Sequence, residues 1–178
     1  MHYPVIDKNG LTVASAVTNL DLHDIARASK TYGAAGFFVV TPVEDQKALA
    51  ERIISHWTRG AGSVYNPDRR DALALVALAD DLAGVAAQVE EQDGQRPLLA
   101  ATDARPRPDT VPEGAVRELL DKGTPVVLVL GTAWGLAREA MEQADLTLAP
   151  IVGGTDYNHL SVRSAAAIYL DRIMGRQP

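Results

Sequence analysis

Two glycine-containing loops in the C-terminal half of the chain are the stretches best suited to bind a ligand. One, Gly-Thr-Ala-Trp-Gly at 131–135, follows the apolar run 124–130, and the other, Val-Gly-Gly-Thr at 152–155, follows the apolar run 146–151. Glycine has no Cβ, so a ligand can approach the backbone, and ligands of open α/β sheets usually bind at strand ends. Exposed backbone N–H and C=O groups can recognise the edge of an adenine. We therefore expect an adenosine-sized ligand.

These loops lack the signatures of other ligand classes. Neither ends in Gly-Lys-Ser/Thr or has the spacing Gly-x-Gly-x-x-Gly, so phosphate and dinucleotide sites are disfavoured. The chain has no cysteine and no pair of histidines at metal-ligand spacing, so we expect no metal site. Ser161 stands where the last helix is expected to begin, and we interpret it as an N-cap or ligand contact rather than a nucleophile. The alternative is that the glycines only shape turns and helix ends.

Arginines are concentrated in two segments that have the composition of loops. The segment 58–70 contains two glycines, a proline, an aromatic residue and the arginines Arg59, Arg69 and Arg70. Guanidinium groups bind phosphates and an aromatic ring stacks on a base, so this segment is a candidate RNA contact. The alternative is an ordinary solvated connection. The proline-rich segment 103–112 carries two more arginines and is either a second candidate contact or a surface excursion.

Apolar runs and amphipathic stretches alternate along the chain. We expect strands at 11–18, 36–41, 73–79, 97–102, 124–130 and 146–151, and helices at 19–32, 43–57, 80–92, 113–122, 136–143 and 160–173. Such alternation predicts an α/β fold with a mostly parallel sheet and helices on both faces. A chain of 178 residues without a repeat or linker is expected to form a single domain, residues 1–178.

The composition limits the classes of function. A net charge of −6 and a pI near 5.1 argue against a protein that coats nucleic acid non-specifically, because such binding depends on neutralising phosphates. An RNA-binding role must then depend on where the arginines lie. The N-terminal residues contain neither a basic n-region nor an apolar h-region, and no apolar run approaches the roughly 20 residues of a membrane span. We therefore expect a cytoplasmic protein without a membrane partner.

Several motifs resemble those of a known class of RNA methyltransferases. The stretches Leu-Gly-Thr-Ala-Trp-Gly-Leu (130–136), Leu-Ala-Pro-Ile (148–151) and Asn-His-Leu-Ser-Val-Arg-Ser-Ala-Ala-Ala-Ile (158–168) are similar to the three C-terminal signatures of the SPOUT class. The resemblance is closest to a small bacterial family of stand-alone SPOUT domains and covers nearly the whole chain. The shared motifs also include 18–27, 31–33, 65–67 and 157–164. The resemblance implies a C-terminal trefoil knot that holds S-adenosylmethionine, which general topology rules would not predict.

The resemblance also implies roles for individual residues. S-adenosylmethionine is expected to contact Leu130, Gly131, Thr132, Trp134, Gly135, Ile151, Gly153, His159, Leu160 and Ser161. Arg27 matches an arginine that SPOUT enzymes present to the methyl-transfer site, and Asn19 supports it. The pKa of a free arginine exceeds about 12, so a carboxylate such as Asp24 or Asp156 would be the better base for a ring nitrogen of guanine. RNA is expected to contact Arg59, Arg69 and Arg70.

The expected function is S-adenosylmethionine-dependent methylation of tRNA or rRNA, at a ribose 2′-hydroxyl or a guanine ring nitrogen. In SPOUT proteins the last helix packs against a partner, so the resemblance implies a homodimer. The alanines 165–167 would permit close approach, and Ile168 and Ile173 would supply apolar contacts. Two other classes remain open: a non-catalytic nucleotide- or RNA-binding module, which the acidic net charge favours, and a doubly wound oxidoreductase or hydrolase.

Overall fold

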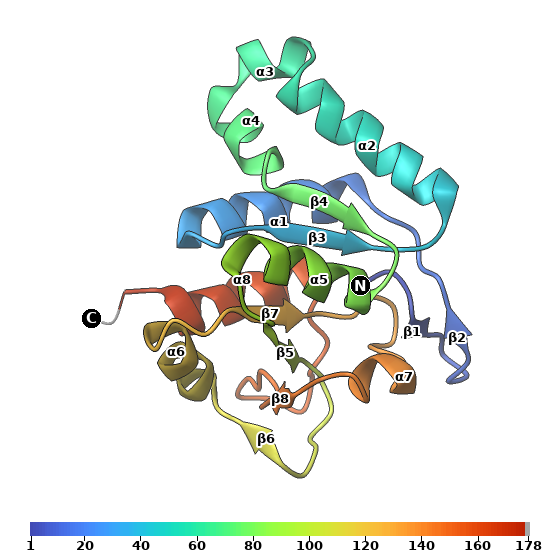
Figure 1. The fold of residues 1–178 in the computed structure, drawn as a ribbon. Helices are drawn as coiled ribbons and strands as arrows, with labels where there is room; N and C mark the ends of the chain where they lie inside the picture. Colours follow the sequence, from blue (N-terminus) through green and yellow to red (C-terminus); the bar gives the residue numbers. More distant parts are fainter. Residues whose placement is uncertain (177–178) are drawn as a thin grey trace.

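The computed structural model describes residues 1–176 and contains two parallel β-sheets (Figure 1). The smaller sheet pairs β3 (Phe37–Val40) with β4 (Val76–Ala79), and the larger has four strands in the order β6-β8-β5-β7. Its strands are β5 (Leu98–Ala101), β6 (Thr110–Val111), β7 (Val126–Val129) and β8 (Leu146–Leu148). All pairings in both sheets are parallel, with Phe37 opposite Val76 and Leu98 opposite Val126. The last two residues of the expected domain, 177 and 178, lie outside the described residues.

The strand sequences explain why these sheets are parallel and buried. β3 has the sequence Phe-Phe-Val-Val and β7 the sequence Val-Val-Leu-Val. Aromatic and β-branched side chains suit a pleated strand, and apolar runs without polar alternation are typical of parallel strands covered on both faces. The predicted α/β fold with parallel strands and covering helices is confirmed.

Eight helices lie within residues 1–176: α1 (Asn19–Tyr32), α2 (Glu44–Thr58), α3 (Ala61–Tyr65), α4 (Pro67–Leu73), α5 (Leu82–Asp93), α6 (Glu113–Asp121), α7 (Arg138–Met141) and α8 (Val162–Met174). The Thr18 side chain accepts a hydrogen bond from the Asp21 N–H at the start of α1, and Gly33 ends that helix with φ 77°. At the start of α8, the Ser161 side chain accepts from the Ser164 N–H. These caps satisfy backbone groups that helix ends leave unpaired.

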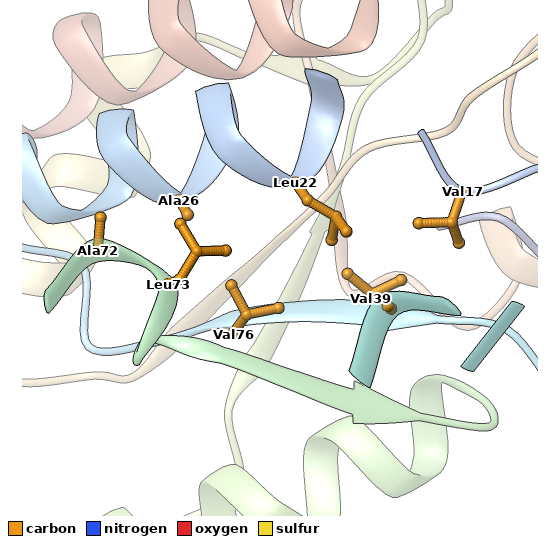
Figure 2. Close-up of a cluster of buried hydrophobic side chains, with 8 residues drawn as sticks. Val17, Leu22, Ala26, Val39, Ala72, Leu73 and Val76 are labelled. Atoms are coloured by element: carbon orange, nitrogen blue, oxygen red, sulfur yellow. The ribbon is translucent and has the colours of Figure 1, made fainter. Parts of the chain in front are cut away.

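α1 packs on the smaller sheet through one apolar face, as Figure 2 shows. Leu22 and Ala26 lie four residues apart, on the side of α1 that faces Val39, Leu73 and Val76. Leu22 is 1% exposed, and full burial of a leucine side chain contributes about 1.5–3 kcal/mol. This packing fixes the position of α1, which carries three of the expected catalytic residues.

A second core joins the larger sheet to the C-terminal helix. Its buried residues include Val116 of α6, Leu148 of β8, and Tyr169 and Ile173 of α8. Because α8 also packs against α1, the last helix links the two cores. In Figure 1, α2, α3 and α4 form a helical arm (residues 44–73) at one end of the molecule, and β6 and β8 lie at the opposite end.

One expected strand is missing from both sheets. The segment 11–18 is expected to pair within the parallel sheet, but only Thr12–Val13 (β2) is a strand, and it pairs antiparallel with Val5–Ile6 (β1) in a separate hairpin. Val17 instead enters the core beneath α1, and its N–H donates to the side chain of Gln46. The expectation is wrong because an alternation of apolar and polar residues indicates only that a segment can be extended. It does not indicate which strand the segment pairs with.

The segment 58–70 also differs from the expected loop, because most of it is helical. Asn66 caps α4 by accepting a hydrogen bond from the Arg69 N–H, and Pro67 occupies the first helical position, where a backbone N–H is not needed. Proline therefore marks a helix start here. Conversely, the proline-rich segment 103–112 contains the short strand β6, which the sequence did not indicate. No helix within residues 1–176 combines the length and apolarity needed to cross a bilayer.

Candidate functional site

Three loops converge at the carboxyl edge of the larger sheet. They follow β5 (102–109), β7 (130–137) and β8 (149–161), three strands that are neighbours in the sheet. The Asn158 side chain donates to the Ala104 carbonyl at 2.9 Å, which joins the third loop to the first. Arg105 of the first loop lies close to the second loop, because a Cβ on Gly135 would lie 3.8 Å from its guanidinium. This edge is the usual ligand site of parallel sheets.

The loop 130–137 folds back tightly on itself. A Cβ on Gly131 would lie only 2.6 Å from the Leu136 nitrogen, so no other residue fits there without a shift of the backbone. Ala133 has φ 53°, in a region that L-residues rarely adopt, and Gly135 has φ 110°. Backbone strain of this kind is common at ligand sites. The loop also leaves Trp134 64% exposed.

The N-terminal segment holds this loop through backbone hydrogen bonds. The amino group of Met1 donates to Leu130 O at 2.8 Å, and Thr132 N–H donates to Met1 O at 3.3 Å. β1 then bonds the far side of the loop, with Ile6 N–H donating to Gly135 O and Trp134 N–H donating to Ile6 O. The backbone of the loop is therefore fixed from both ends by residues that lie more than 120 positions away.

A chain of side-chain hydrogen bonds supports the loop from beneath. His2 Nδ1 lies 3.0 Å from Ser15 Oγ, and Ser15 Oγ in turn contacts the Thr132 hydroxyl. The Thr132 hydroxyl also donates to Met1 O at 3.0 Å. Burial, together with the neighbouring N-terminal amine, lowers the pKa of His2 to about 4. His2 is therefore a neutral part of the network at physiological pH. No sequence pattern indicates His2 or Ser15, because their role depends on the contact of Ser15 with the distant Thr132.

The third loop carries the second group of expected donor residues. Its start is anchored by Tyr169, whose hydroxyl donates to Ala149 O at 2.9 Å, and burial raises the pKa of Tyr169 to about 12. A Cβ on Gly153 or Gly154 would meet no atom within 4 Å, so their backbone faces open space. Leu160 is 42% exposed next to the Ser161 cap. This loop thus presents bare backbone, an apolar side chain and a helix start.

Arg163 connects the beginnings of α1 and α8. Its Nη1 lies 3.3 Å from Asp21 Oδ1 and its Nε lies 3.5 Å from Asp24 Oδ2. Asp21 is buried and also accepts a hydrogen bond from the Thr18 hydroxyl at 2.6 Å. Asp24, a candidate base, therefore already has a cationic partner. Sequence reasoning did not single out Arg163, although its place two residues after Ser161, inside the motif 158–168, was the available signal.

The other two expected catalytic residues are exposed on α1. Asn19 is the first residue of the helix, at the same end as Asp21, and Arg27 follows Asp24 by one turn. Among residues 1–176 the Arg27 guanidinium makes no ion pair and no hydrogen bond to the three loops. The fold brings the expected donor residues to one sheet edge and leaves Arg27 available to a further group.

The arginines expected to contact RNA have three different environments in the helical arm. Arg69 lies with its guanidinium 4.6 Å from the centroid of the Trp57 ring, and its Nε is buried. Arg70 pairs with Asp71 at 2.9 Å. Arg59 is exposed at the end of α2. Of the three, Arg69 is therefore engaged in packing within the arm, and Arg59 is the best placed to reach a ligand.

Asp103 organises two further arginines in the loop after β5. Its carboxylate accepts from Arg105 Nε at 3.1 Å and from Arg107 Nε at 2.7 Å. Burial opposes ionisation of Asp103, but hydrogen bonds from the Arg105 backbone and from both guanidinium groups hold its pKa below the usual range. Both arginines line a cleft of about 590 Å³ with Arg138, Glu139 and Glu142. Fixed guanidinium groups beside the loop 130–137 suit contacts with phosphates.

The fold is shared with solved methyltransferase structures. A SpoU methyltransferase, AviRb, from Streptomyces viridochromogenes in complex with AdoMet has a TM-score of 0.56 at 20% identity, over 89% of this chain and 56% of that one. A TrmH/SpoU tRNA modifying enzyme from A. aeolicus has a TM-score of 0.57 at 18% identity, over 90% of this chain and 70% of that one. This chain therefore shares its fold with these two structures.

Sequence comparison gives the family. Residues 1–175 match the model of a family described as SAM-dependent RNA methyltransferase, and the chain belongs to that family. An uncharacterized protein of Aquifex aeolicus is 40% identical over 177 residues, which are 99% of this chain and 86% of that protein.

A second kind of relative is much longer. A protein of Oleidesulfovibrio alaskensis, named tRNA (guanine-N(1)-)-methyltransferase, is 46% identical over 175 residues, which are 98% of this chain and 41% of that protein. A protein of the same name from Nitratidesulfovibrio vulgaris is 45% identical over an equal span. This chain therefore spans about two fifths of the length of these relatives, and their name describes the longer proteins.

Proposed function

We propose that this protein transfers a methyl group from S-adenosylmethionine to RNA, and that the loops 130–137 and 149–161 form its donor site. The observation that carries the proposal is the convergence of three loops from adjacent parallel strands in a member of a SAM-dependent RNA methyltransferase family. Such a site suits methyl transfer, because the protein mainly positions donor and acceptor and removes a proton.

The residues of these loops fit an adenosine-containing donor. Leu130, Ile151 and Leu160 offer apolar surface, and the exposed backbone of Gly153 leaves room for close approach. We assign donor contacts to Leu130, Gly131, Thr132, Trp134, Gly135, Ile151, Gly153, His159, Leu160 and Ser161. Bound S-adenosylmethionine would supply a methyl group activated by a positively charged sulfur. The loops' part is to orient the donor and to exclude water from it.

On the acceptor side we assign Arg27 and Asn19 to orienting the RNA. Among residues 1–176 the guanidinium of Arg27 has no ion-pair partner, so it suits an anionic group of the RNA or the charge that develops on the acceptor. If the acceptor is a guanine ring nitrogen, we assign the removal of its proton to Asp24, the exposed carboxylate of α1. Arg163 would then hold Asp24 in place. A ribose 2′-hydroxyl acceptor would depend on Arg27 and the RNA itself.

We propose tRNA as the substrate class. The names of the two longer relatives support tRNA, although the match covers only 41% of each, so their guanine-N1 chemistry is not assigned to this segment. Arg59 and the cleft of Arg105 and Arg107 are the surfaces best placed for phosphates. A tRNA substrate also supports the expected cytoplasmic location.

We further propose a trefoil knot at residues 149–161 and a homodimer. The hydrogen bond from Asn158 to Ala104 and the packing of α8 against α1 support a C-terminal segment that is tucked among earlier loops. For the dimer, the expected contribution of Ile173 is wrong, because Ile173 is buried inside its own chain. Exposed apolar residues of the loops, Trp134, Tyr157 and Leu160, are better candidates for a partner's contacts. Light scattering on the purified protein tests the dimer.

The proposed donor site is tested by calorimetric titration with S-adenosylmethionine, S-adenosylhomocysteine and NAD. We expect micromolar binding of the first two and none of NAD. Gly131→Ala should weaken binding at least tenfold, because its Cβ would collide with the Leu136 backbone and move the loop. Gly114→Ala is the matched control, since a Cβ there meets no atom within 4 Å on α6.

Absence of donor binding in protein shown to be folded would contradict the donor site. Preferential binding of NAD would favour the oxidoreductase class instead. If the Gly131 and Gly114 variants lost affinity equally, the loop 130–137 would not be the binding element.

A further inference from the structure

The two parallel sheets face each other through unpaired strand edges. β3 pairs only with β4, and β7 pairs only with β5, so each has one free edge within the described chain. Figure 1 shows the arrows of β3 and β7 pointing the same way. A cavity of about 400 Å³ lies between them, lined mainly by apolar residues of both strands and of α1, α5, α6 and α8. Backbone groups in such a buried place normally have hydrogen-bond partners.

Met1 and His2 already fill one end of this gap in the manner of a strand. Met1 N donates to Leu130 O, and Thr132 N–H donates to Met1 O, which is the hydrogen-bond pattern of a parallel ladder with Met1 opposite Gly131. On the other side, His2 N–H donates to Val40 O at 2.9 Å, at the end of β3. These two residues therefore bridge the carboxyl ends of β7 and β3.

The direction and length of the gap follow from this pattern. A strand that ends at Met1 and His2, beside the carboxyl ends of β3 and β7, runs parallel to both. Each neighbour is four residues long, so about four more residues, at roughly 3.3 Å each, would span the gap. The lining is apolar on both faces, as for a central parallel strand. The buried amino group of Met1, whose pKa burial lowers to about 5, occupies the place of a peptide N–H.

We propose that the cavity between β3 and β7 is the seat of a further parallel strand of about four apolar residues, joined to the amino side of Met1. This strand unites the two sheets into one, in the order β4-β3-new strand-β7-β5-β8-β6. The N-terminal segment, which holds the loop 130–137, is then continuous with a central strand of the sheet. The inference stands on the sheet geometry alone and does not depend on the proposed methyl transfer.

The test compares three proteins: the 178-residue chain, the chain extended before Met1 by Thr-Val-Ile-Val, and the chain extended by Gly-Ser-Gly-Ser. Amide hydrogen exchange is measured for residues 36–40 and 126–130, and 1-anilinonaphthalene-8-sulfonate fluorescence reports open apolar surface. We expect the apolar extension to slow exchange at both edges at least tenfold and to abolish dye binding. The Gly-Ser extension should change neither by more than about twofold.

Three results would overturn the proposal. The first is equal exchange in the two extended proteins. The second is protection of β3 and β7 in the 178-residue chain that already equals that of β5, because the edges would then be paired without an added strand. The third is loss of dye binding in the 178-residue chain on dimerisation, which would assign the gap to a second copy.

Discussion

The three-loop edge and the helical arm contain similar residue types but use them in opposite ways. At the edge, backbone hydrogen bonds from the N-terminal segment fix the loop 130–137, and Trp134 stays exposed. In the arm, the side chains themselves are used for packing: Trp57 contacts His23, His56 and Arg69. Trp134 is available to a ligand because another part of the chain supports its loop, whereas Trp57 and Arg69 are used for packing.

The largest effect is expected for Arg27→Ala. Arg27 has no ion-pair partner within residues 1–176, so its loss should lower methyl transfer to tRNA at least about 100-fold while donor affinity changes little. Transfer of a labelled methyl group and calorimetry measure the two quantities. Arg52→Ala, an exposed arginine of α2, is the control and should retain full activity. Donor binding without any transfer in the wild-type protein would instead favour a non-catalytic module.

The second prediction compares the two tryptophans directly. Trp57→Ala should lower the free energy of unfolding by about 3 kcal/mol, because it removes a ring packed in the arm. Trp134→Ala should change it by less than about 0.5 kcal/mol, as for other exposed positions. Urea unfolding measures both. Equal losses would mean that the loop depends on its side chains as much as the arm does.

The third prediction concerns His2 and the network beneath the loop. The folded pKa of about 4 lies below the ordinary value of 6.5, so the unfolded chain binds the proton more readily. The neutral His2 side chain therefore makes its full contribution to the free energy of unfolding above about pH 6.5. This contribution is lost as the pH falls towards 4, with a loss of about 2 kcal/mol by pH 4.5. His2→Asn, which keeps a polar partner for Ser15 but does not titrate, should make this profile less steep. The remaining slope includes the amino group of Met1, whose pKa burial lowers to about 5.

Urea unfolding at pH 7.5 and pH 4.5 checks this difference. His159→Asn is the matched control, because His159 is exposed and its removal should leave the profile unchanged. A profile of the same steepness in the His2 variant would show that other groups govern acid sensitivity.

The smallest effect is expected for single arginines of the arm. Arg59→Ala should weaken tRNA binding and reduce the slope of log affinity against log salt by about 1, as for the loss of one phosphate contact. Arg69→Ala should leave the slope unchanged and lower stability instead, since its guanidinium lies on Trp57. Filter binding at several salt concentrations measures the slopes. The reverse pattern would show that the arm opens on RNA.

Much of the fold was accessible from the sequence because it depends on local signals. The apolar runs around β3, β5 and β7 and the cap Ser161 indicate strands and a helix start without reference to distant residues. The prediction of a sheet strand at 11–18 is wrong because the pairing of a strand depends on distant partners. Asn66 and Pro67 are typical of loops, but the same pair also begins helices, as it does at α4.

The features of the candidate site likewise divide into those that follow from local sequence signals and those that depend on distant partners. The convergence of the glycine loops follows from the rule that parallel strands end at one edge, so it could be predicted. The support from Met1, His2 and Ser15 could not, because it has no characteristic spacing. Met1 bonds Leu130, 129 positions away, Ser15 bonds Thr132, 117 positions away, and His2 acts only through Ser15. The pairing of Arg163 with Asp24 likewise depends on how α8 packs on α1.

The exposure of Trp134 gives the protein an optical reporter. The chain has two tryptophans, one exposed in the loop 130–137 and one packed in the helical arm. A Trp57→Phe protein would have a single indole, that of Trp134 in the loop. The emission maximum of this indole and its quenching by iodide would report its contact with solvent. Stopped-flow fluorescence of this variant would time the arrival of a ligand at the loop in the absence of any label.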